Sequence, residues 1–170
     1  MPDLREDVLS ALRTFQLAKA HGATEALGGI DLEVPGSVYG LVGPNGAGET
    51  TTLERLAGLR QPSAGRIELG AGQDSVAYCP GAPEFETWLT AVGVPDVASG
   101  AAGKAALTAA LGAMLEQAGL SEAAKRRVGG FSRGMRSRLG LAAGLIGEPK
   151  LLTADEPAAA LGALCGLIAG

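Results

Sequence analysis

The sequence contains few aromatic residues, a single histidine and no excess of basic residues. Aromatic residues make up 4% of the 170 positions, so helix predictions rest on the spacing of leucine more than on bulky side chains. Lys and Arg number 14 against 18 Asp and Glu, which gives a net charge of −4. This balance argues against a nucleic-acid-binding surface. Any recognition of phosphate is therefore expected to be local.

Long apolar runs and cysteine clusters are also missing. The longest apolar run, residues 158–170, has 13 residues, whereas about 20 are needed to cross a bilayer. Membrane contact is therefore expected only through a partner. The opening MPDLRED lacks the basic and apolar regions of a signal peptide, and Cys79 and Cys165 are the only cysteines. Together these features predict a cytoplasmic protein, and the length suits one globular domain.

Apolar periodicity predicts a mixed α/β chain. Short alternating stretches at 12–18 and 30–34 predict an antiparallel β-rich opening segment. SVYGLV at 37–42 predicts a buried strand, and the next segment predicts a helix with Leu53, Leu56 and Ala57 on one face. Further strands are expected at 66–69, 76–78 and 150–154, and helical segments at about 87–120 and 135–146.

Residues 43–50 read GPNGAGET, close to the phosphate-binding pattern GxxxxGK[ST]. In such a loop the backbone N–H groups surround the phosphates and place them at the N-terminus of the following helix. Gly43, Gly46 and Gly48 allow positive φ angles and a close approach of the backbone. Thr50 is expected to place a hydroxyl on Mg²⁺, and Thr51 another near the α-phosphate. An ordinary glycine-rich turn is the weaker alternative, because strand, loop and helix occur in the right order.

Glu49 stands where this pattern has lysine. The exchange changes the local charge by two units, and one pair of unit charges at 4 Å is worth about 4 kcal/mol at an effective dielectric constant of 20. Solvent, a side chain that turns away, or Mg²⁺ would reduce the penalty. We therefore expect catalysis to suffer more than binding, since the backbone cradle does not depend on this side chain.

Two adjacent carboxylates follow the last predicted strand, in LLTADE. Asp155 is placed to hold the Mg²⁺ shell and Glu156 to polarise an attacking water. On its own, a DE pair before proline is more typical of a solvated turn, but its place after a strand and downstream of the phosphate loop favours the metal site instead.

The stretch VGGFSRGMRSRLGLAAGLIGEPKLLTADEP, residues 128–157, resembles the ATPase domain of ABC (ATP-binding cassette) transporters, as does GPNGAGETTTLERLAGLRQPSAGRIEL. The match runs from about Phe15 to the end. FSRGM at 131–135 occupies the place of the family's signature motif. Ser132 also suits the N-cap of the following helix. Five arginines, at 126, 127, 133, 136 and 138, make this stretch basic, and a solvated face explains them as well as a site does.

The resemblance implies an α/β P-loop NTPase fold of the ABC type, with the sheet incomplete at the C-terminus. A single domain over 12–170 is expected, with a helical insert at about 84–146 and an N-terminal extension at 1–11. The implied activity is ATP hydrolysis that drives transport through transmembrane permease subunits, at the inner face of the plasma membrane. A second ATP-binding subunit is implied as well, because Ser132 and Gly134 would contact the γ-phosphate bound in the opposite subunit. ATP is expected on the loop residues Gly43, Pro44, Asn45, Gly46, Ala47, Gly48, Glu49, Thr50 and Thr51, and Mg²⁺ on Thr50 and Asp155.

Several positions depart from the family pattern. His21 stands where an aromatic residue stacks on adenine, and it could equally be a surface loop residue. Gly81 replaces a glutamine that links the metal to the transporter interface, and Gly162 an aspartate that contacts the partner subunit. No residue supplies the family's histidine switch, which suggests a truncated copy. We expect poor ATP hydrolysis. Alternatives are a non-catalytic partner of an intact ATPase subunit, a degenerate relic, or a soluble ABC protein of translation or DNA repair.

Overall fold

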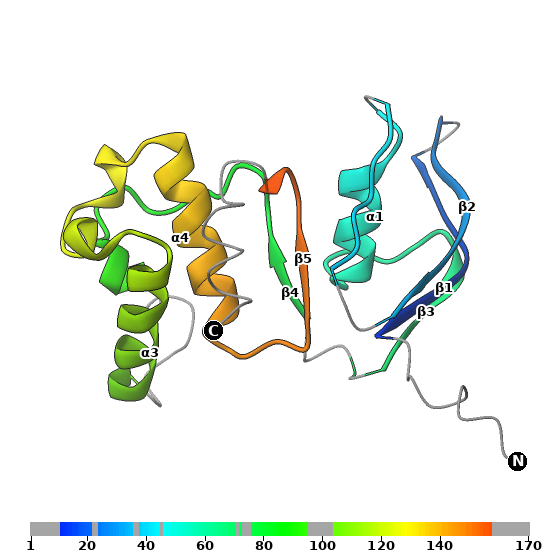
Figure 1. The fold of residues 1–170 in the computed structure, drawn as a ribbon. Helices are drawn as coiled ribbons and strands as arrows, with labels where there is room; N and C mark the ends of the chain where they lie inside the picture. Colours follow the sequence, from blue (N-terminus) through cyan, green and yellow to red (C-terminus); the bar gives the residue numbers. More distant parts are fainter. Residues whose placement is uncertain are drawn as a thin grey trace, which may run out of the picture. The chain divides into compact units, whose positions relative to one another are not determined.

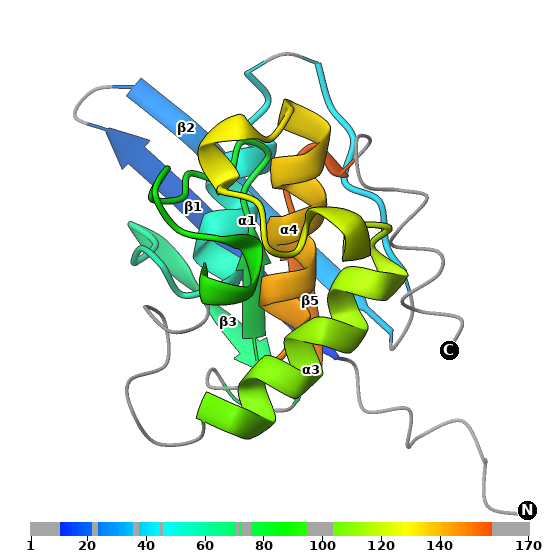
Figure 2. The same cartoon turned by 90° about the vertical axis from the view of Figure 1, so that its left-hand side faces the viewer.

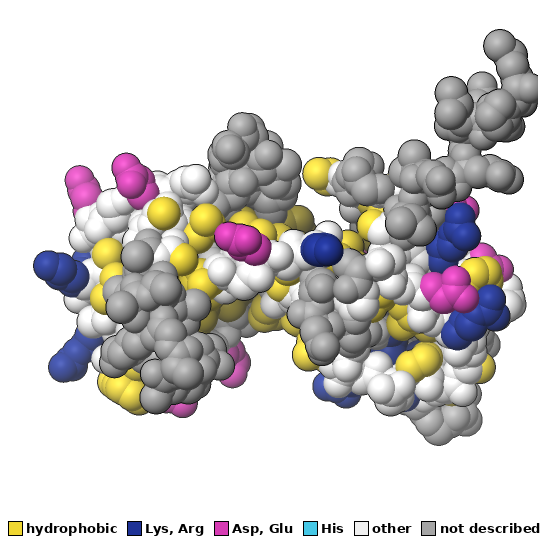
Figure 3. All heavy atoms as spheres, turned by 90° about the horizontal axis from the view of Figure 1, so that it is seen from below, with side chains coloured by type: hydrophobic (Ala, Val, Ile, Leu, Met, Phe, Trp, Pro, Cys, Tyr) yellow, Lys and Arg dark blue, Asp and Glu magenta, His cyan; other side chains and the backbone are white. Residues whose placement is uncertain are grey.

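The chain divides into two units, Met1–Tyr78 and Cys79–Gly170, and each is described by itself. The computed structural model describes residues 11–21, 24–35, 38–44, 46–70, 72, 76–94 and 104–157. Both strands and helices occur along these residues (Figure 1), so the predicted α/β class is confirmed. On the face seen in Figure 3, acidic and basic side chains are interspersed rather than gathered into one basic patch.

The first unit contains a three-stranded antiparallel sheet in the order β2-β1-β3. Its strands are β1 (Leu12–His21), β2 (Thr24–Val34) and β3 (Ala64–Leu69). Leu12 lies opposite Val34 on β2 and Leu69 on β3. The buried side chains of β1 and β2 are Leu12, Thr14, Leu17, Leu27 and Val34. The antiparallel opening segment and the strand at 66–69 are therefore confirmed, because alternating apolar residues cover one face of a pleated sheet.

A bulge interrupts β1 at Gln16, whose φ is 47°. The backbone N–H of Gln16 donates to Asp31 Oδ1 at 2.6 Å, and its side-chain amide donates to Asp31 Oδ2. Gly65 lies against the same bulge: a Cβ at Gly65, whose φ is +84°, would stand 2.3 Å from the carbonyl oxygen of Gln16. Only glycine fits beside the bulge without moving the backbone.

Helix α1 (Glu49–Leu56) follows the glycine-rich loop, as predicted, and contacts β2. Its buried residues are Thr52, Arg55 and Leu56, whereas Leu53 and Ala57 are only half-buried. The predicted apolar face is therefore correct only at Leu56. The inward face includes a guanidinium, and Arg55 is 1% exposed.

The prediction of a buried strand at 37–42 is wrong for the residues that the structure describes. Residues 38–42 have no regular secondary structure, and Val38, Tyr39 and Val42 are 74%, 57% and 93% exposed. A strand buried on both faces needs hydrogen-bonded neighbours at its edges. No strand in the described ranges pairs with these residues, so their apolar character alone does not make a strand.

The second unit is mainly helical and contains α3 (Lys104–Gln117) and α4 (Arg133–Leu145), which pack side by side (Figure 2). Short 3₁₀ turns lie at η2 (Ala91–Gly93), η3 (Ser121–Ala123) and η4 (Val128–Gly130). One apolar cluster joins them; its buried members are Ala91, Val94, Leu111, Leu115, Ala118, Leu120, Ala123, Val128, Phe131, Leu139 and Ala142. Leu139 and Ala142 belong to the predicted apolar face of 135–146, which is confirmed. The helical prediction for 87–120 holds for α3, but residues 87–89 form a turn and a bend, and Thr90 forms an isolated antiparallel bridge with Arg127.

Two short strands, β4 (Val76–Cys79) and β5 (Leu151–Ala154), pair with each other and confirm the predictions for 76–78 and 150–154. Leu141 of α4 packs with Cys79 under this pair. Burial raises the pKa of the Cys79 thiol to about 11. The boundaries predicted for the single domain and its insert stay predictions. No helix within the described ranges has the length and apolarity to span a bilayer.

Candidate nucleotide-binding site

The loop before α1 has the backbone shape that the glycines predict. Ala47 N donates to the carbonyl of Pro44 at 2.9 Å and closes a turn. Gly46 and Gly48 have φ angles of +85° and +94°, which confirms the expectation of left-handed backbone at these two positions. Helix α1 begins directly after Gly48, which has no side chain to cap it. The open N-terminus of α1 therefore faces the loop, as a phosphate site requires.

Gly43 is needed for a different reason, the close approach of its neighbours. A Cβ at Gly43 would lie 2.7 Å from the Cβ of Ala47 and 2.8 Å from Oε1 of Glu49. The loop thus folds tightly over Gly43. Asn45 lies outside the described residues.

Glu49 turns its carboxylate back over the loop. Besides the Oε1 contact, its Cδ would lie 3.3 Å from a Cβ at Gly43, and the side chain is half-buried. The residue does not point away into solvent, so the predicted repulsion of an anion keeps much of its strength. Each pair of unit charges at 4 Å is worth about 4 kcal/mol at an effective dielectric constant of 20.

The residues present fit a nucleotide in shape and oppose it in charge. The positive φ angles of Gly46 and Gly48 and the uncapped start of α1 suit a phosphate. The carboxylate of Glu49 stands on that same loop. Within the described parts of the chain, no group of three or more metal-binding side chains gathers. A joint magnesium site of Thr50 and Asp155, which lie in different units, stays a prediction.

The two carboxylates after β5 lie at the end of the second unit. Asp155 N donates to the carbonyl of Cys79 at 2.9 Å, which ties this turn to β4. Glu156 is exposed, and its φ is 44°, a left-handed conformation that is uncommon outside glycine. Such backbone often marks functional positions.

Gly81 and Arg133 are the neighbours of Glu156. A Cβ at Gly81 would lie 3.1 Å from the Cβ of Glu156 and 3.2 Å from the carbonyl oxygen of Asp155. Glycine at 81 therefore removes the expected glutamine side chain and also lets Glu156 approach. Arg133 Nη2 lies 2.9 Å from Glu156 Oε2, and the two side chains are 69% and 70% exposed. The sequence did not reveal this ion pair, because a spacing of 23 residues carries no local signal.

The FSRGM segment begins α4. Ser132 Oγ accepts a hydrogen bond from Met135 N at 3.2 Å, so the predicted N-cap is confirmed. Arg136 Nη1 donates to the carbonyl of Phe131 at 2.6 Å and holds the preceding turn. At Gly134 a Cβ would meet nothing within 4 Å, so this face of α4 is open.

The remaining predicted site residues are only partly described. His21 pairs with Thr24 at the end of β1, and its side chain lies outside the described part. Thr50 is exposed and Thr51 half-buried in the first turn of α1. Gly162 and Cys165 fall beyond the described residues. The phosphate loop belongs to the first unit, and Ser132, Asp155 and Glu156 belong to the second.

The chain is similar in sequence to ATP-binding proteins of transporters. The family model "ABC transporter" matches residues 27–159. The uncharacterized ABC transporter ATP-binding protein YxlF of Bacillus subtilis is 42% identical over 85% of this chain and 52% of its own length. The bacitracin transport ATP-binding protein BcrA of Bacillus licheniformis is 34% identical over 86% of this chain and 51% of its own length. The chain thus spans about half the length of these relatives.

Solved structures show the same fold. The structure of an ATP-binding subunit of an ABC transporter has a TM-score of 0.75 and 24% identity, and covers 93% of this chain and 73% of that one. The structure of cbiO1 from Clostridium perfringens, part of the ABC transporter complex cbiONQ, has a TM-score of 0.75 and 23% identity, with 94% and 73% covered. With the glycine-rich loop, the capped FSRGM helix and the carboxylates after β5, these matches show that the chain belongs to the ABC transporter family and carries its P-loop ATP-binding fold.

Proposed function

We propose that this chain acts as the ATP-binding subunit of an ABC transporter and couples ATP binding and hydrolysis to transport. The observation that carries the proposal is the shape of the 43–48 loop. Its two left-handed glycines and the tight approach at Gly43 leave the backbone N–H groups and the start of α1 to receive phosphates. The names of YxlF and BcrA, both ATP-binding proteins of transporters, support the same function.

Each part of the site has a proposed role. Bound Mg²⁺ would neutralise charge on the transferred phosphoryl group, and Thr50 and Asp155 would hold it. Glu156 would orient and deprotonate the attacking water. Ser132 and Gly134 would present the N-terminus of α4 to the γ-phosphate held by a second ATP-binding subunit, and His21 would stack on adenine.

Hydrolysis by this chain is proposed to be weak. Glu49 places a negative charge on the loop where a lysine would assist the leaving phosphates. Gly81 offers no side chain to the metal. The backbone cradle remains, so binding of Mg-ATP is expected to survive better than turnover.

Transmembrane permease subunits are the proposed partners, together with a second ATP-binding subunit, equal or different. The chain would then lie at the cytoplasmic face of the plasma membrane and touch the membrane only through these partners. The description of cbiO1 as part of a transporter complex supports this arrangement.

A non-catalytic partner role is the second candidate, and one contrast favours it. The FSRGM helix keeps its Ser132 cap, whereas the phosphate loop of the same chain carries Glu49. Such a chain could complete the ATP site of an intact subunit while its own site turns over little.

Titration with Mg-ATP and measurement of turnover test both candidates, for wild type, Glu49→Gln and Glu49→Lys, alone and mixed with an intact homologous subunit. Glu49→Gln removes the charge, and Glu49→Lys restores the family's cation. We expect each step to tighten ATP binding about tenfold, since 1.4 kcal/mol corresponds to a factor of ten and solvent screens the nominal charge energy. Turnover is expected to rise only with Glu49→Lys.

Three outcomes separate the candidates. Turnover by wild type alone at the rate of the Glu49→Lys variant contradicts weak hydrolysis. Stimulation of the intact subunit by wild type, lost on Ser132→Ala, supports the non-catalytic role. Failure of all three variants to bind ATP contradicts the ATP-binding function and leaves a degenerate relic.

A further inference from the structure

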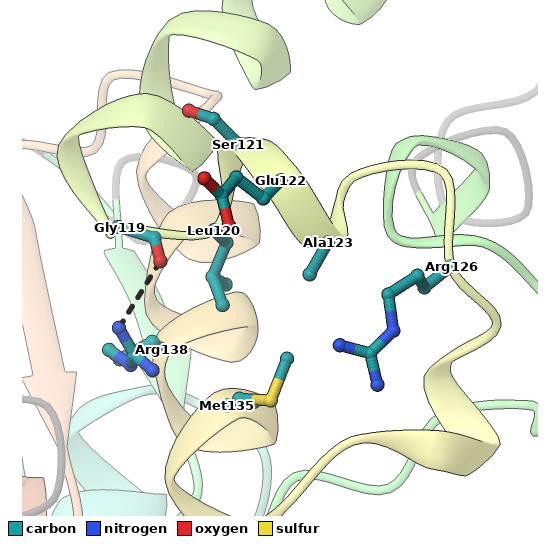
Figure 4. Close-up of a pocket in the computed structure, with 8 residues that line it drawn as sticks. All are labelled: Gly119, Leu120, Ser121, Glu122, Ala123, Arg126, Met135 and Arg138. Carbon is teal, nitrogen blue, oxygen red and sulfur yellow. Dashed lines mark hydrogen bonds between the residues drawn. The ribbon is translucent and has the colours of Figure 1, made fainter.

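A surface pocket of about 370 Å³ lies in the second unit, between η3 and the start of α4. Figure 4 shows its eight lining residues: Gly119, Leu120, Ser121, Glu122, Ala123, Arg126, Met135 and Arg138. Leu120 and Ala123 are buried and form an apolar floor, whereas Ser121, Glu122 and Arg126 are exposed. The pocket is thus open to solvent at its rim and apolar at its base.

Arg138 forms one wall and is fixed in place by backbone carbonyls. Its Nη1 donates to Ala118 O at 3.0 Å and to Gly119 O at 3.4 Å, and its Nε donates to Gly134 O at 3.4 Å. No carboxylate of the described residues lies within ion-pair distance of Arg138. These bonds orient the guanidinium, and no described residue places an anion on its charge.

Arg126 reaches into the pocket from the opposite side (Figure 4). Its guanidinium carbon lies 5.9 Å from the centroid of the Phe131 ring, close enough for a cation–π contact that restricts the side chain. Glu122 is the only acid in the lining, and it forms no ion pair with either Arg126 or Arg138. Two cations and one anion therefore border an apolar floor, and neither guanidinium group is paired with a carboxylate of the described part of the chain.

We propose that this pocket binds a protein partner through an acidic side chain that lies beside an apolar one. A carboxylate would give Arg126 a planar, charge-assisted partner and would also approach the fixed charge of Arg138. The neighbouring apolar side chain would cover Leu120, Ala123 and Met135. The methionine suits this contact, because its flexible thioether adapts to different shapes.

The size and surroundings favour a protein segment over a small molecule. Small-molecule sites bury most of the ligand in roughly 300–1,000 Å³. This pocket stands at the lower end of that range, with an exposed rim. Exposed Lys125 and Arg127 flank Arg126 and add positive charge. A positive field of this kind steers an acidic partner toward its site. The pocket includes no residue of the phosphate loop and neither of the carboxylates after β5, and it shares only Met135 with the FSRGM segment.

A titration followed by NMR tests the proposal on the full chain. The probe is a helical peptide of roughly 15 residues, with one Glu and one Leu a helical turn apart in a neutral background. The matched peptide carries Gln in place of Glu. The observed signals are the side-chain Nε–Hε resonances of Arg126 and Arg138. We expect the Glu peptide to shift both resonances and to bind about tenfold more tightly than the Gln peptide.

Two variants locate the effect. Arg126→Gln should weaken binding of the Glu peptide about tenfold, to the level of the Gln peptide. Lys125→Gln, a neighbouring exposed cation that does not line the pocket, should change it less than twofold. The proposal is overturned by equal binding of the two peptides, by unchanged binding in Arg126→Gln, or by equal losses in the two variants. Repeating the titration with Glu49→Lys separates the result from ATP binding, because that change should leave peptide affinity unaltered.

Discussion

Replacing Arg55 by methionine is expected to stabilise the protein. The side chain of Arg55 is 1% exposed, and its Nε and Nη1 have no hydrogen-bond partner among the residues that the structure describes. Glu54 Oε2 lies 3.8 Å from Nη1. That oxygen also lies 3.3 Å from Nε of the exposed Arg60, so Glu54 keeps a partner when Arg55 is removed.

The magnitude follows from two opposing terms. Each buried unsatisfied donor costs about 1–3 kcal/mol, so two donors cost about 2–6 kcal/mol. The attraction of Glu54 offsets only part of this cost: about 4 kcal/mol at an effective dielectric constant of 20 is its upper bound, and solvent at Glu54 and the competing Arg60 reduce it. Replacing buried ion pairs by apolar side chains of similar volume stabilises by about 1–4 kcal/mol at best. We expect Arg55→Met to add about 2 kcal/mol and to raise Tm by roughly 4–8 °C for a chain of this size.

Urea unfolding followed by circular dichroism measures the change, with Arg60→Met as the matched control. Arg60 shares Glu54 but is exposed, so its replacement should change stability by less than about 0.5 kcal/mol. A loss of about 1 kcal/mol or more on Arg55→Met would refute the reasoning, since it would mean that the guanidinium is satisfied in the folded protein.

Three further predictions concern single positions. Gly65→Ala should lower the free energy of unfolding by at least about 2 kcal/mol, because the new Cβ would lie 2.3 Å from a carbonyl oxygen of β1. The control Gly72→Ala has a similar φ of +80° but nothing within 4 Å of the new Cβ, and it should lower the free energy of unfolding by only about 1 kcal/mol. Equal losses in urea unfolding would contradict the steric reason. Ser132→Ala should lower the free energy of unfolding by about 1 kcal/mol, and Ser132→Asp should lower it much less, since aspartate also caps a helix. Equal losses in the two variants would exclude capping as the cause. Burial raises the pKa of Cys79 from 9.0 to about 11, so the thiol of the folded protein stays protonated to a higher pH than that of the unfolded chain. The free energy of unfolding is therefore expected to fall by roughly 2–3 kcal/mol between pH 9 and 11. Cys79→Ala should remove this fall in a Cys165→Ser background, and an unchanged pH profile would contradict it.

Local rules predicted the elements whose signals lie within a few residues. Ser132 was recognised as an N-cap from the helical pattern after it, and the structure supplies the bond to Met135. The glycines of the loop allow positive φ because they lack a Cβ, and Gly46 and Gly48 adopt it. Alternation likewise predicted β3, and a short apolar run predicted β5, since both signals lie within a few residues.

Features that depend on distant neighbours could not be predicted in the same way. Residues 38–42 are apolar enough for a strand, but strand formation also needs partners at both edges. Arg55 is buried because the inward face of α1 runs through Thr52 and Leu56, a rotation of the helix that its leucines alone do not define. The contact of Arg133 with Glu156 depends on how α4 returns to the end of β5.

The position of the Glu156 carboxylate depends on an ion pair with Arg133 and on the left-handed backbone of Glu156, and these two respond differently to ionic strength. The ion pair with Arg133 is exposed on both sides, so it contributes about 0–1 kcal/mol and fades as salt is added. The left-handed backbone of Glu156 is set by the turn after β5 and does not respond to salt. At the salt concentration of a cell, the turn therefore aims this side chain, and Arg133 adds only a weak, screened restraint.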